Sequence, residues 1–427
     1  TKIERPGGDP FRSQLGYRGW LRGRRSAELD LTSEADRGVF QALAREADVV
    51  VESFKPGKAA ELGIDYATLS KANPRLIQCS ITGYGRENRH ADRPAFDALV
   101  AARIGLQWEQ RGRPGGSAAH LSGQPPFEPD YEVPAEAQQG PDRDGPLFSA
   151  SRFPSLGAAY AAVTAISAAL RAREVTGRGQ WVETSLLQGA LSAGVMAYGY
   201  GQKLDAWGYT TWIGDSRSPK GLFECADGRW IHCWPPSPRF VLAAGEGDAL
   251  DAHPDLRVRE DPERIGLGPE ELFVLHHYWE PMAKTIAKFT ADAWTEAGAE
   301  AGVCIQKIRS PEEGFSDPLL FEDGCVAEVE DPELGPIRTA GVLYRLGNSP
   351  GQAGTRIPAV GEHTEAVRSE AAAASASQAP TEKKAELAGG PLEGIRVLDF
   401  GLAVAGPSPP GRGSFVEVLH FWSSQPA

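Results

Sequence analysis

The feature that most constrains the fold is an alternation of helical segments with short apolar runs. Residues 33–47 repeat apolar side chains at a helical period, and residues 48–52 form a run of β-branched residues typical of a buried strand. A second helical stretch at 66–72 precedes a second apolar run at 75–81. Strands joined through helices at this spacing imply right-handed crossovers and a parallel sheet, so we expect an α/β fold.

The alternation of predicted helices and strands continues past residue 90, and its character changes at residue 221. Helices are predicted over 94–108 and, in a long Ala-rich segment, over 156–173, followed by a strand over 180–185. Residues 222–225 and 229–234 flank an Asp-Gly turn, the signal of a β-hairpin. This hairpin is expected to begin a second, smaller α+β region.

Charge and cysteine content narrow the class of protein. The 427 residues include 44 Lys and Arg and 57 Asp and Glu, a formal net charge of −13. This surplus of acid disfavours nucleic acid or an anionic membrane as a partner, although it permits a local cationic pocket for a phosphorylated small molecule. The longest low-polarity stretch, 156–170, is interrupted by Thr and Ser, so we expect no membrane-spanning helix. The five cysteines are scattered, which favours reduced thiols and a cytoplasmic location.

Three local patterns have ordinary structural interpretations. Residues 176–180 (TGRGQ) end the Ala-rich helix rather than begin one, which favours a C-terminal cap over a phosphate loop. The histidines, including His276 and His277, lack the spacing of metal ligands, so we expect no metal. Cys225 and Cys233 lie on facing strands of the predicted hairpin and are expected to be core thiols.

A series of motifs in fixed order carries the interpretation further. The series comprises residues 2–12, 25–31, 48–57 (DVVVESFKPG), 62–64, 73–77, 82–85, 176–182, 331–337 and 361–364. In this order the motifs resemble family III CoA-transferases of the CaiB/BaiF type. That family includes formyl-CoA transferase, the carnitine CoA-transferases and α-methylacyl-CoA racemase.

The resemblance also gives an interpretation of both ends of the chain. Residues 392–400 (LEGIRVLDF) are similar to the strand with which family members open, and no such strand precedes residue 1. We therefore expect the first repeat of a two-repeat protein, truncated at both ends, in which 391–407 start the second repeat and 408–427 are an aberrant tail. A disordered tail is the alternative.

The resemblance implies a Rossmann-like parallel-sheet domain built from both chain ends, a smaller α+β domain between them, and an interlocked dimer or tandem pseudo-dimer. The expected divisions are a large CoA-binding part at 1–215 with a Gly/Pro-rich insertion at 111–146, a small domain at 216–325, a return to the large domain at 326–368, and a linker at 369–390. An apolar sheet edge is expected beside 49–51 or Ile77, unless residues 391–400 fold back and fill the vacant strand position.

In the family, an Asp at the start of the Ala-rich helix attacks the donor thioester and then carries CoA as an enzyme thioester. Counting back from residues 176–180 without gaps places the position of that Asp at Ser155. A serine has no carbonyl carbon on which CoA can end, so Ser155 could at most accept an acyl group, and the alternative is a helix cap. Asp142 or Asp144, shifted by the insertion, is a further candidate. Asp97 matches an acidic position beside the nucleophile and either orients it or lies on a solvated helix face.

The positions that match the family's CoA-contacting residues are Arg5, Leu29, Thr32, Ser53, Phe54 and Lys58. Arg5 corresponds to an arginine near the adenine, and Phe54 lies in a loop that lines the CoA cleft. Where the family usually has an arginine for the pyrophosphate, this chain has Glu61, which would repel it. Lys55 and Lys58 are close enough in sequence to compensate.

The resemblance therefore implies a CoA-transferase whose substrates are an acyl-CoA and a small carboxylic acid, with no permanently bound cofactor. We expect its activity to require a second repeat, which would supply the working carboxylate, or a homodimer partner. We expect neither a nucleic-acid nor a membrane partner. A catalytically silent, CoA-binding repeat is the alternative. An acyl-CoA racemase ranks last, because no His matches the family's base position.

Overall fold

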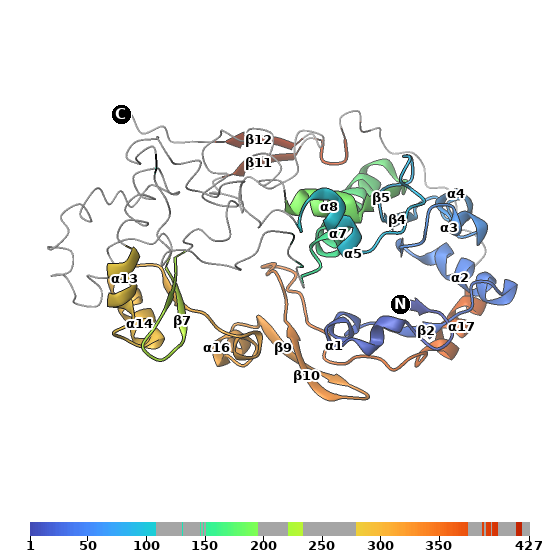
Figure 1. Cartoon of the computed structure of the whole chain (residues 1–427). Helices are drawn as coiled ribbons and strands as arrows, with labels where there is room; N and C mark the ends of the chain where they lie inside the picture. The colour runs from blue at the N-terminus through green and yellow to red at the C-terminus, as the bar shows by residue number, and fades with distance from the viewer. Residues whose placement is uncertain are drawn as a thin grey trace. The chain divides into compact units, whose positions relative to one another are not determined.

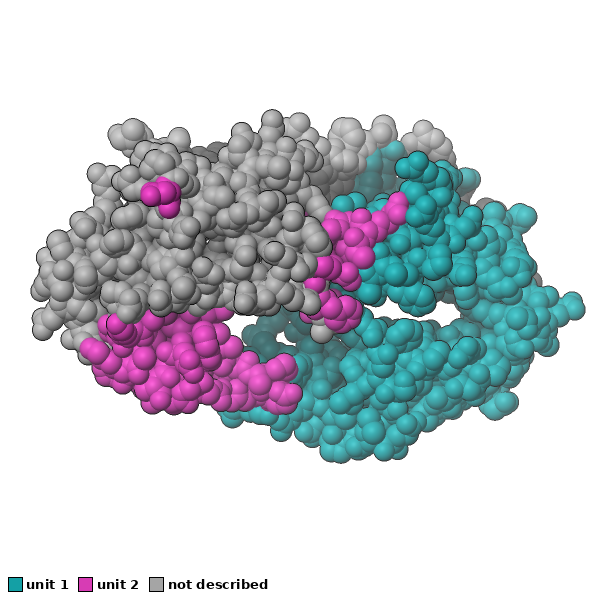
Figure 2. Space-filling model, viewed as in Figure 1, with its two compact units in different colours: residues 1–100, 152–193, 315–427 teal, residues 101–151, 194–314 magenta. Residues whose placement is uncertain are grey.

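The computed structural model describes residues 1–107, 130, 146, 148, 151–194, 221–233, 279–374, 387, 390–393, 395–399 and 416–420. The chain divides into two units (Figure 2). Unit 1 comprises residues 1–100, 152–193 and 315–427, and unit 2 comprises residues 101–151 and 194–314. Most of the expected insertion at 111–146 lies outside the described residues, and the domain limits expected from the sequence stay predictions.

A three-stranded parallel sheet in unit 1 carries the candidate site. Its strands, in spatial order, are β3 (Val49–Glu52), β4 (Ile77–Thr82) and β5 (Trp181–Ser185). Their β-branched and aromatic side chains suit a pleated, covered surface, and both pairings are parallel. The three strands predicted from the apolar runs are confirmed, and so is the α/β fold class.

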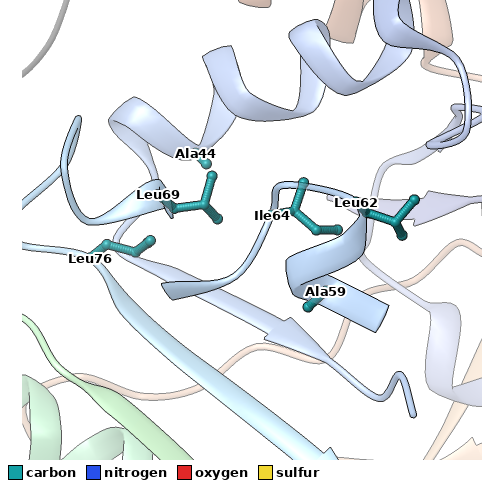
Figure 3. Packing of buried hydrophobic residues seen from close by; sticks show 6 residues of the cluster. All are labelled: Ala44, Ala59, Leu62, Ile64, Leu69 and Leu76. Carbon is teal, nitrogen blue, oxygen red and sulfur yellow. The ribbon is translucent and has the colours of Figure 1, made fainter. Parts of the chain in front are cut away.

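Short helices around β3 enclose an apolar cluster (Figure 3). They are α2 (Glu34–Glu46), α3 (Lys58–Glu61) and α4 (Tyr66–Leu69). The cluster consists of Ala44, Ala59, Leu62, Ile64, Leu69 and Leu76. The buried Asn73 side chain donates to the carbonyls of Ala44 (3.0 Å) and Ala47 (2.9 Å), and so satisfies the end of α2.

Two helices pack beside β4 and β5 (Figure 1). α7 (Phe153–Thr176) contacts both strands and α8 (Leu186–Ala193). The helices cross at two glycines, since a Cβ built on Gly157 would lie 2.2 Å from the Gly189 carbonyl oxygen. α7 ends at Gly177, whose φ of 75° is left-handed and whose N–H bonds to the Arg173 carbonyl at 2.8 Å. The predicted C-terminal cap is confirmed.

A second parallel sheet in unit 1 joins β1 (Lys2–Glu4) to β2 (Ser26–Glu28). The buried Glu4 carboxylate accepts hydrogen bonds from Arg12 Nη2 (2.7 Å), Arg12 Nε (2.9 Å) and Ser26 Oγ (2.5 Å). α17 (Thr364–Ala373) packs on β2 and extends into the segment 369–390 that the sequence suggested was a linker.

Segments from the two ends of unit 1 meet through a buried ion pair. Arg18 donates from Nε to Asp331 Oδ2 at 2.5 Å and from Nη2 to Oδ1 at 2.6 Å. Leu21 packs nearby against Val329 and Ile357. The elements involved are η1 (Pro10–Ser13), α1 (Leu15–Arg18), η2 (Gly19–Leu21), α16 (Pro318–Glu322), β9 (Val326–Asp331) and β10 (Gly335–Ala340), and the last two pair antiparallel.

The sheet of β1 and β2 is separate from the sheet of β3, β4 and β5, whereas the resemblance implied one sheet. Among the described residues, β1 pairs only with β2, and β3 pairs only with β4. Val51 on β3 is 55% exposed, so the apolar edge lies beside 49–51. The alternative at Ile77 is wrong, because Ile77 is fully buried in the central strand.

The strand expected to fill the vacant position pairs elsewhere. β11 (Ile395–Asp399) forms a parallel pair with β12 (Val416–His420), and not with β1 or β3. β12 falls within 408–427, which the sequence suggested was an aberrant tail. This strand was not predicted from the sequence, because 408–427 contains no helical pattern that would continue a strand–helix unit after residues 392–400.

Unit 2 contains an antiparallel sheet in the order β6-β7-β8. Its elements are β6 (Leu222–Glu224), β7 (Trp230–Cys233), β8 (Ile305–Lys307), α13 (Trp279–Ile286), α14 (Ala291–Ala301) and α15 (Pro311–Gly314), while α5 (Asp97–Ile104) spans the boundary between the units. The predicted hairpin turn is confirmed, with Gly228 at φ 70°. Burial raises the pKa of Cys225 to about 11 and of Cys233 to about 12, so both are core thiols as predicted.

One helix corrects the expectation that nothing in the chain is long and apolar enough to span a membrane. Within the described residues, α7 meets that criterion by length and composition, although 28% of its most apolar window is buried in the protein. Thr164 and Ser167 did not interrupt it, because their hydroxyls donate to the carbonyls four residues back, Tyr160 (2.9 Å) and Val163 (2.8 Å). Core helices of water-soluble proteins meet the same criterion.

Candidate active site

The candidate site lies where β4 and β5 end. The Gly83 carbonyl, just after β4, accepts a hydrogen bond from the Leu187 N–H of α8 at 3.1 Å. Ala95 packs so closely on Gly83 that a Cβ there would lie 2.1 Å from the Ala95 Cβ. The loop that leads to α5 is thus held against the strand end, and carboxyl ends of parallel strands are where α/β sheets bind ligands.

Ser155 and Asp97 are brought together at this edge of the sheet. The Ser155 N–H donates to Asp97 Oδ1 at 2.8 Å, and the Ser155 hydroxyl donates to Asp97 Oδ2 at 2.7 Å. Both residues are half-buried. Ser155 lies in the first turn of α7, whose 24 residues direct a positive partial charge at the carboxylate. Asp97 therefore caps α7 from a different helix.

The alternative in which Ser155 caps a helix beginning at residue 156 is wrong. α7 begins at Phe153, and the Leu156 N–H already bonds to the Arg152 carbonyl at 3.0 Å. Pro154 starts the helix early, since its fixed φ and missing N–H suit a first turn. The Ser155 N–H is consequently a first-turn donor with no acceptor inside α7, and the Asp97 carboxylate accepts its hydrogen bond. Asp142 and Asp144 lie outside the described residues.

This arrangement permits two kinds of acyl chemistry. Asp97 could remove the Ser155 proton, so that the serine oxygen accepts an acyl group. Alternatively, the Asp97 carboxylate could itself attack a thioester, with the Ser155 N–H and hydroxyl as donors to its oxygens. Only the second route provides a carbonyl carbon to which CoA can be transferred.

Three of the CoA-contacting candidates lie at the carboxyl end of β3. Ser53 is exposed, and Phe54 packs against the apolar cluster of Figure 3. Lys58 Nζ lies 2.6 Å from Glu61 Oε1. Of the two lysines expected to compensate for Glu61, Lys58 is thus paired with it, which reduces the positive charge available to a pyrophosphate.

The other three candidates follow β1 and β2. Arg5 is exposed, and Leu29 is buried with its N–H on the Glu4 carbonyl at 2.9 Å. Thr32 uses its hydroxyl locally, donating to Asp30 Oδ1 at 2.6 Å, which lowers the pKa of Asp30. Within the described part of the chain, no hydrogen bond or ion pair joins this group to the β3 group or to Ser155 and Asp97.

A charged cluster around Arg86 was not predicted from the sequence. Its Nη2 donates to Glu52 Oε1 and Ser80 Oγ, both at 2.6 Å, and its guanidinium lies 5.2 Å from the Trp181 ring centroid. Glu183 Oε1 is 3.7 Å from Arg86 Nε. The strand register places these side chains on one face of adjacent strands. Alternation along the strands was a usable signal, but the register was not known. Among the described residues, no group of three or more His, Cys, Asp or Glu could hold a metal.

Comparisons with known proteins agree with this architecture. Residues 1–364 match the family model described as CoA-transferase family III. The succinyl-CoA–D-citramalate CoA-transferase of Chloroflexus aurantiacus is 26% identical over 382 residues, covering 85% of this chain and 84% of that protein. The acetyl-CoA:oxalate CoA-transferase of Acetobacter aceti is 32% identical over 352 residues, covering 78% and 80%. A crystal structure of a CaiB/BaiF family protein from Brucella suis superposes with a TM-score of 0.63 at 22% identity, covering 87% and 91%.

Proposed function

This chain belongs to CoA-transferase family III, and we propose that it moves CoA from an acyl-CoA thioester to a small carboxylic acid. The observation that carries the proposal is the half-buried Asp97 carboxylate against Ser155, at the first turn of α7. A carboxylate held by two donors near a helix N-terminus suits acyl chemistry in which negative charge develops on its oxygens. CoA and acyl-CoA are then substrates, and no permanent cofactor is needed.

The named activities of the relatives suggest which donors to test. The Chloroflexus relative is named for succinyl-CoA and D-citramalate, and the Acetobacter relative for acetyl-CoA and oxalate. We therefore propose succinyl-CoA or acetyl-CoA as the donor and a dicarboxylic acid as the acceptor.

We further propose that activity requires a partner, either a second repeat or a second copy of the chain, in the cytoplasm. Two features support a partner. β1 and β3 each lack a neighbour on one side among the described residues, and a strand between them would join the two sheets into one. In addition, α7 exposes a stripe of Phe153, Leu156, Tyr160 and Val163. Deleting 391–427 should lower the melting temperature if β11 supplies that strand to another copy, and an unchanged melting curve would contradict it.

The test of function is isotope exchange. The chain is incubated with succinyl-CoA and labelled succinate, or with acetyl-CoA and labelled acetate, over a wide range of chain concentrations. Label should enter the CoA ester, and specific activity should rise with concentration if two copies form the active species. The absence of exchange at every concentration, with both donors, would refute the proposal for a pair of identical chains.

A second candidate function is a silent CoA-binding repeat. It is favoured by Ser155, which has no carbonyl carbon, and by the Lys58–Glu61 pair near the expected pyrophosphate position. CoA binding by calorimetry without any exchange would support this candidate over the first. A racemase ranks below both, because no His matches the position of the family's base.

A further inference from the structure

CoA transfer between two acids requires a carboxyl group on the enzyme when CoA is held covalently. The thioester bond joins sulfur to a carbonyl carbon, which a serine hydroxyl lacks. The sequence suggested that a second repeat supplies this carboxyl group. The structure instead presents one within this chain, 2.7 Å from the serine.

The surroundings of the nearby carboxylates single out Asp97. Glu52 is buried and bound at 2.6 Å by Arg86, which also lies near Glu183. A carboxylate held in an ion pair is a poorer nucleophile, because the cation stabilises its charge. Asp97 is half-buried, and the contacts it makes within the described residues come from the N–H and hydroxyl of Ser155, both uncharged donors.

Resting on the proposed function, we infer that Asp97 is the residue that carries CoA, and that Ser155 is its positioning residue. Asp97 Oδ2 attacks the thioester carbon, the C–S bond breaks, and CoA leaves as the thiolate, which gives a mixed anhydride. The thiolate then attacks the Asp97 carbonyl carbon, the donor acid leaves as its carboxylate, and the Asp97–CoA thioester remains. The acceptor carboxylate reverses both steps. No proton or electron is gained or lost.

The hydrogen bonds of Ser155 fit these steps atom by atom. Asp97 Oδ1, which the Ser155 N–H holds at 2.8 Å, is the oxygen that remains on the carbon throughout and becomes the oxyanion when the thiolate attacks. A fixed backbone donor at that oxygen stabilises the tetrahedral intermediate. Oδ2, which the hydroxyl holds at 2.7 Å, is the oxygen that bonds to the acyl group and leaves with it. The hydroxyl therefore orients the attacking atom and releases it when the anhydride forms.

The inference is tested by trapping on the full chain. Succinyl-CoA is the probe, and hydroxylamine converts an aspartyl thioester or anhydride into a hydroxamate, which peptide mass spectrometry locates. We expect the hydroxamate at Asp97. Asp97→Asn should abolish both trapping and exchange, although the amide keeps an acceptor for the Ser155 N–H and a similar volume. Ser155→Ala should trap at the same residue about tenfold more slowly, because one hydrogen bond to a charged group is lost. Asp92→Asn changes an exposed residue on the loop that precedes α5, and this matched control should behave as the unmodified chain.

Each outcome has one meaning. A hydroxamate on another residue, or exchange that survives in Asp97→Asn, overturns the inference and leaves the proposed function intact. Acyl transfer that Ser155→Ala abolishes, without a hydroxamate at Asp97, also overturns it and indicates a serine acyl-enzyme. No exchange by the unmodified chain at any concentration refutes the proposed function for a pair of identical chains, and the inference with it. Mapping the hydroxamate on the unmodified chain does not depend on how any variant folds.

Discussion

The close crossing of α7 and α8 predicts that Gly157→Ala disturbs the candidate site. The added Cβ would lie 2.2 Å from the Gly189 carbonyl oxygen, whereas real Cβ contacts essentially never fall below 3.0 Å. The helices must therefore separate locally by at least 3.0 − 2.2 = 0.8 Å. Residue 157 is two positions from Ser155, so a shift of that size is comparable to the stretch from 2.8 Å to about 3.6 Å at which a hydrogen bond is lost.

The energy balance for this change can be worked from two opposing effects. Replacing glycine by alanine inside a helix favours folding by about 1 kcal/mol. Overpacking a close contact costs about 1–3 kcal/mol, and the backbone atoms here cannot rotate away. We expect Gly157→Ala to destabilise unit 1 by up to about 2 kcal/mol net. Gly38→Ala is the matched control, since Gly38 lies inside α2 with no atom within 4 Å of an added Cβ, and it should stabilise the chain by up to about 1 kcal/mol.

Two measurements check the reasoning. The midpoint temperature of thermal unfolding, followed by circular dichroism, should be lower for Gly157→Ala and higher for Gly38→Ala than for the unmodified chain. Hydrogen exchange should quicken at the Ser155 amide only in Gly157→Ala, because that amide is protected by Asp97. If both variants melt higher and the Ser155 amide exchanges at the same rate in each, then the crossing does not position the Ser155–Asp97 pair.

Three further predictions concern other parts of the chain. Glu61→Arg removes the partner of Lys58 and should tighten CoA binding about five- to tenfold, less at high salt; calorimetry that finds unchanged or weaker binding means that residue 61 faces away from the CoA cleft. Burial raises the pKa of Glu4, but the hydrogen bonds from Arg12, Ser26 and the Asp9 N–H and the charge of Arg12 together outweigh it and hold the pKa below its ordinary 4.5. Because the folded pKa is lower than the unfolded one, this contribution to stability is present above about pH 4.5 and is lost as pH falls through the folded pKa. The urea midpoint of Glu4→Gln should therefore fall less between pH 7 and 3 than that of the unmodified chain, and an equal fall in both would argue against the prediction. Burial raises the pKa of Cys79 to about 11, so at pH 8 an alkylating reagent should leave it unmodified in the folded chain, and rapid labelling there would show that β4 opens.

The elements that sequence predicts well are those fixed by local periodicity. The helix at 33–47 and the strands at 48–52 and 75–81 match α2, β3 and β4 closely. The helical spacing of the apolar residues indicates the buried face of α2, and the β-branched runs indicate buried strands. The end of α7 was equally predictable, since Gly177 provides the left-handed residue that a helix end favours.

Features that depend on long-range register could not be predicted. The Ser155–Asp97 pair joins residues 58 positions apart, and its geometry depends on α7 beginning at Phe153, which the Ala-rich pattern did not indicate. The Arg86 cluster likewise requires the pairing of three strands. Nor did the motifs reveal that β1 and β2 form a sheet separate from that of β3, β4 and β5, because pairing partners are not encoded in any single strand.

The bond between Arg18 and Asp331 has a consequence for how the protein is made. Its partners are 313 residues apart, so at about 5–20 residues per second a ribosome takes roughly 15–60 s to deliver the second after the first. During that interval Arg18 lacks the carboxylate that fixes it, and Leu21 lacks Val329 and Ile357. The first strands of the nascent chain therefore keep apolar surface exposed while the residues up to Asp331 are still being synthesised.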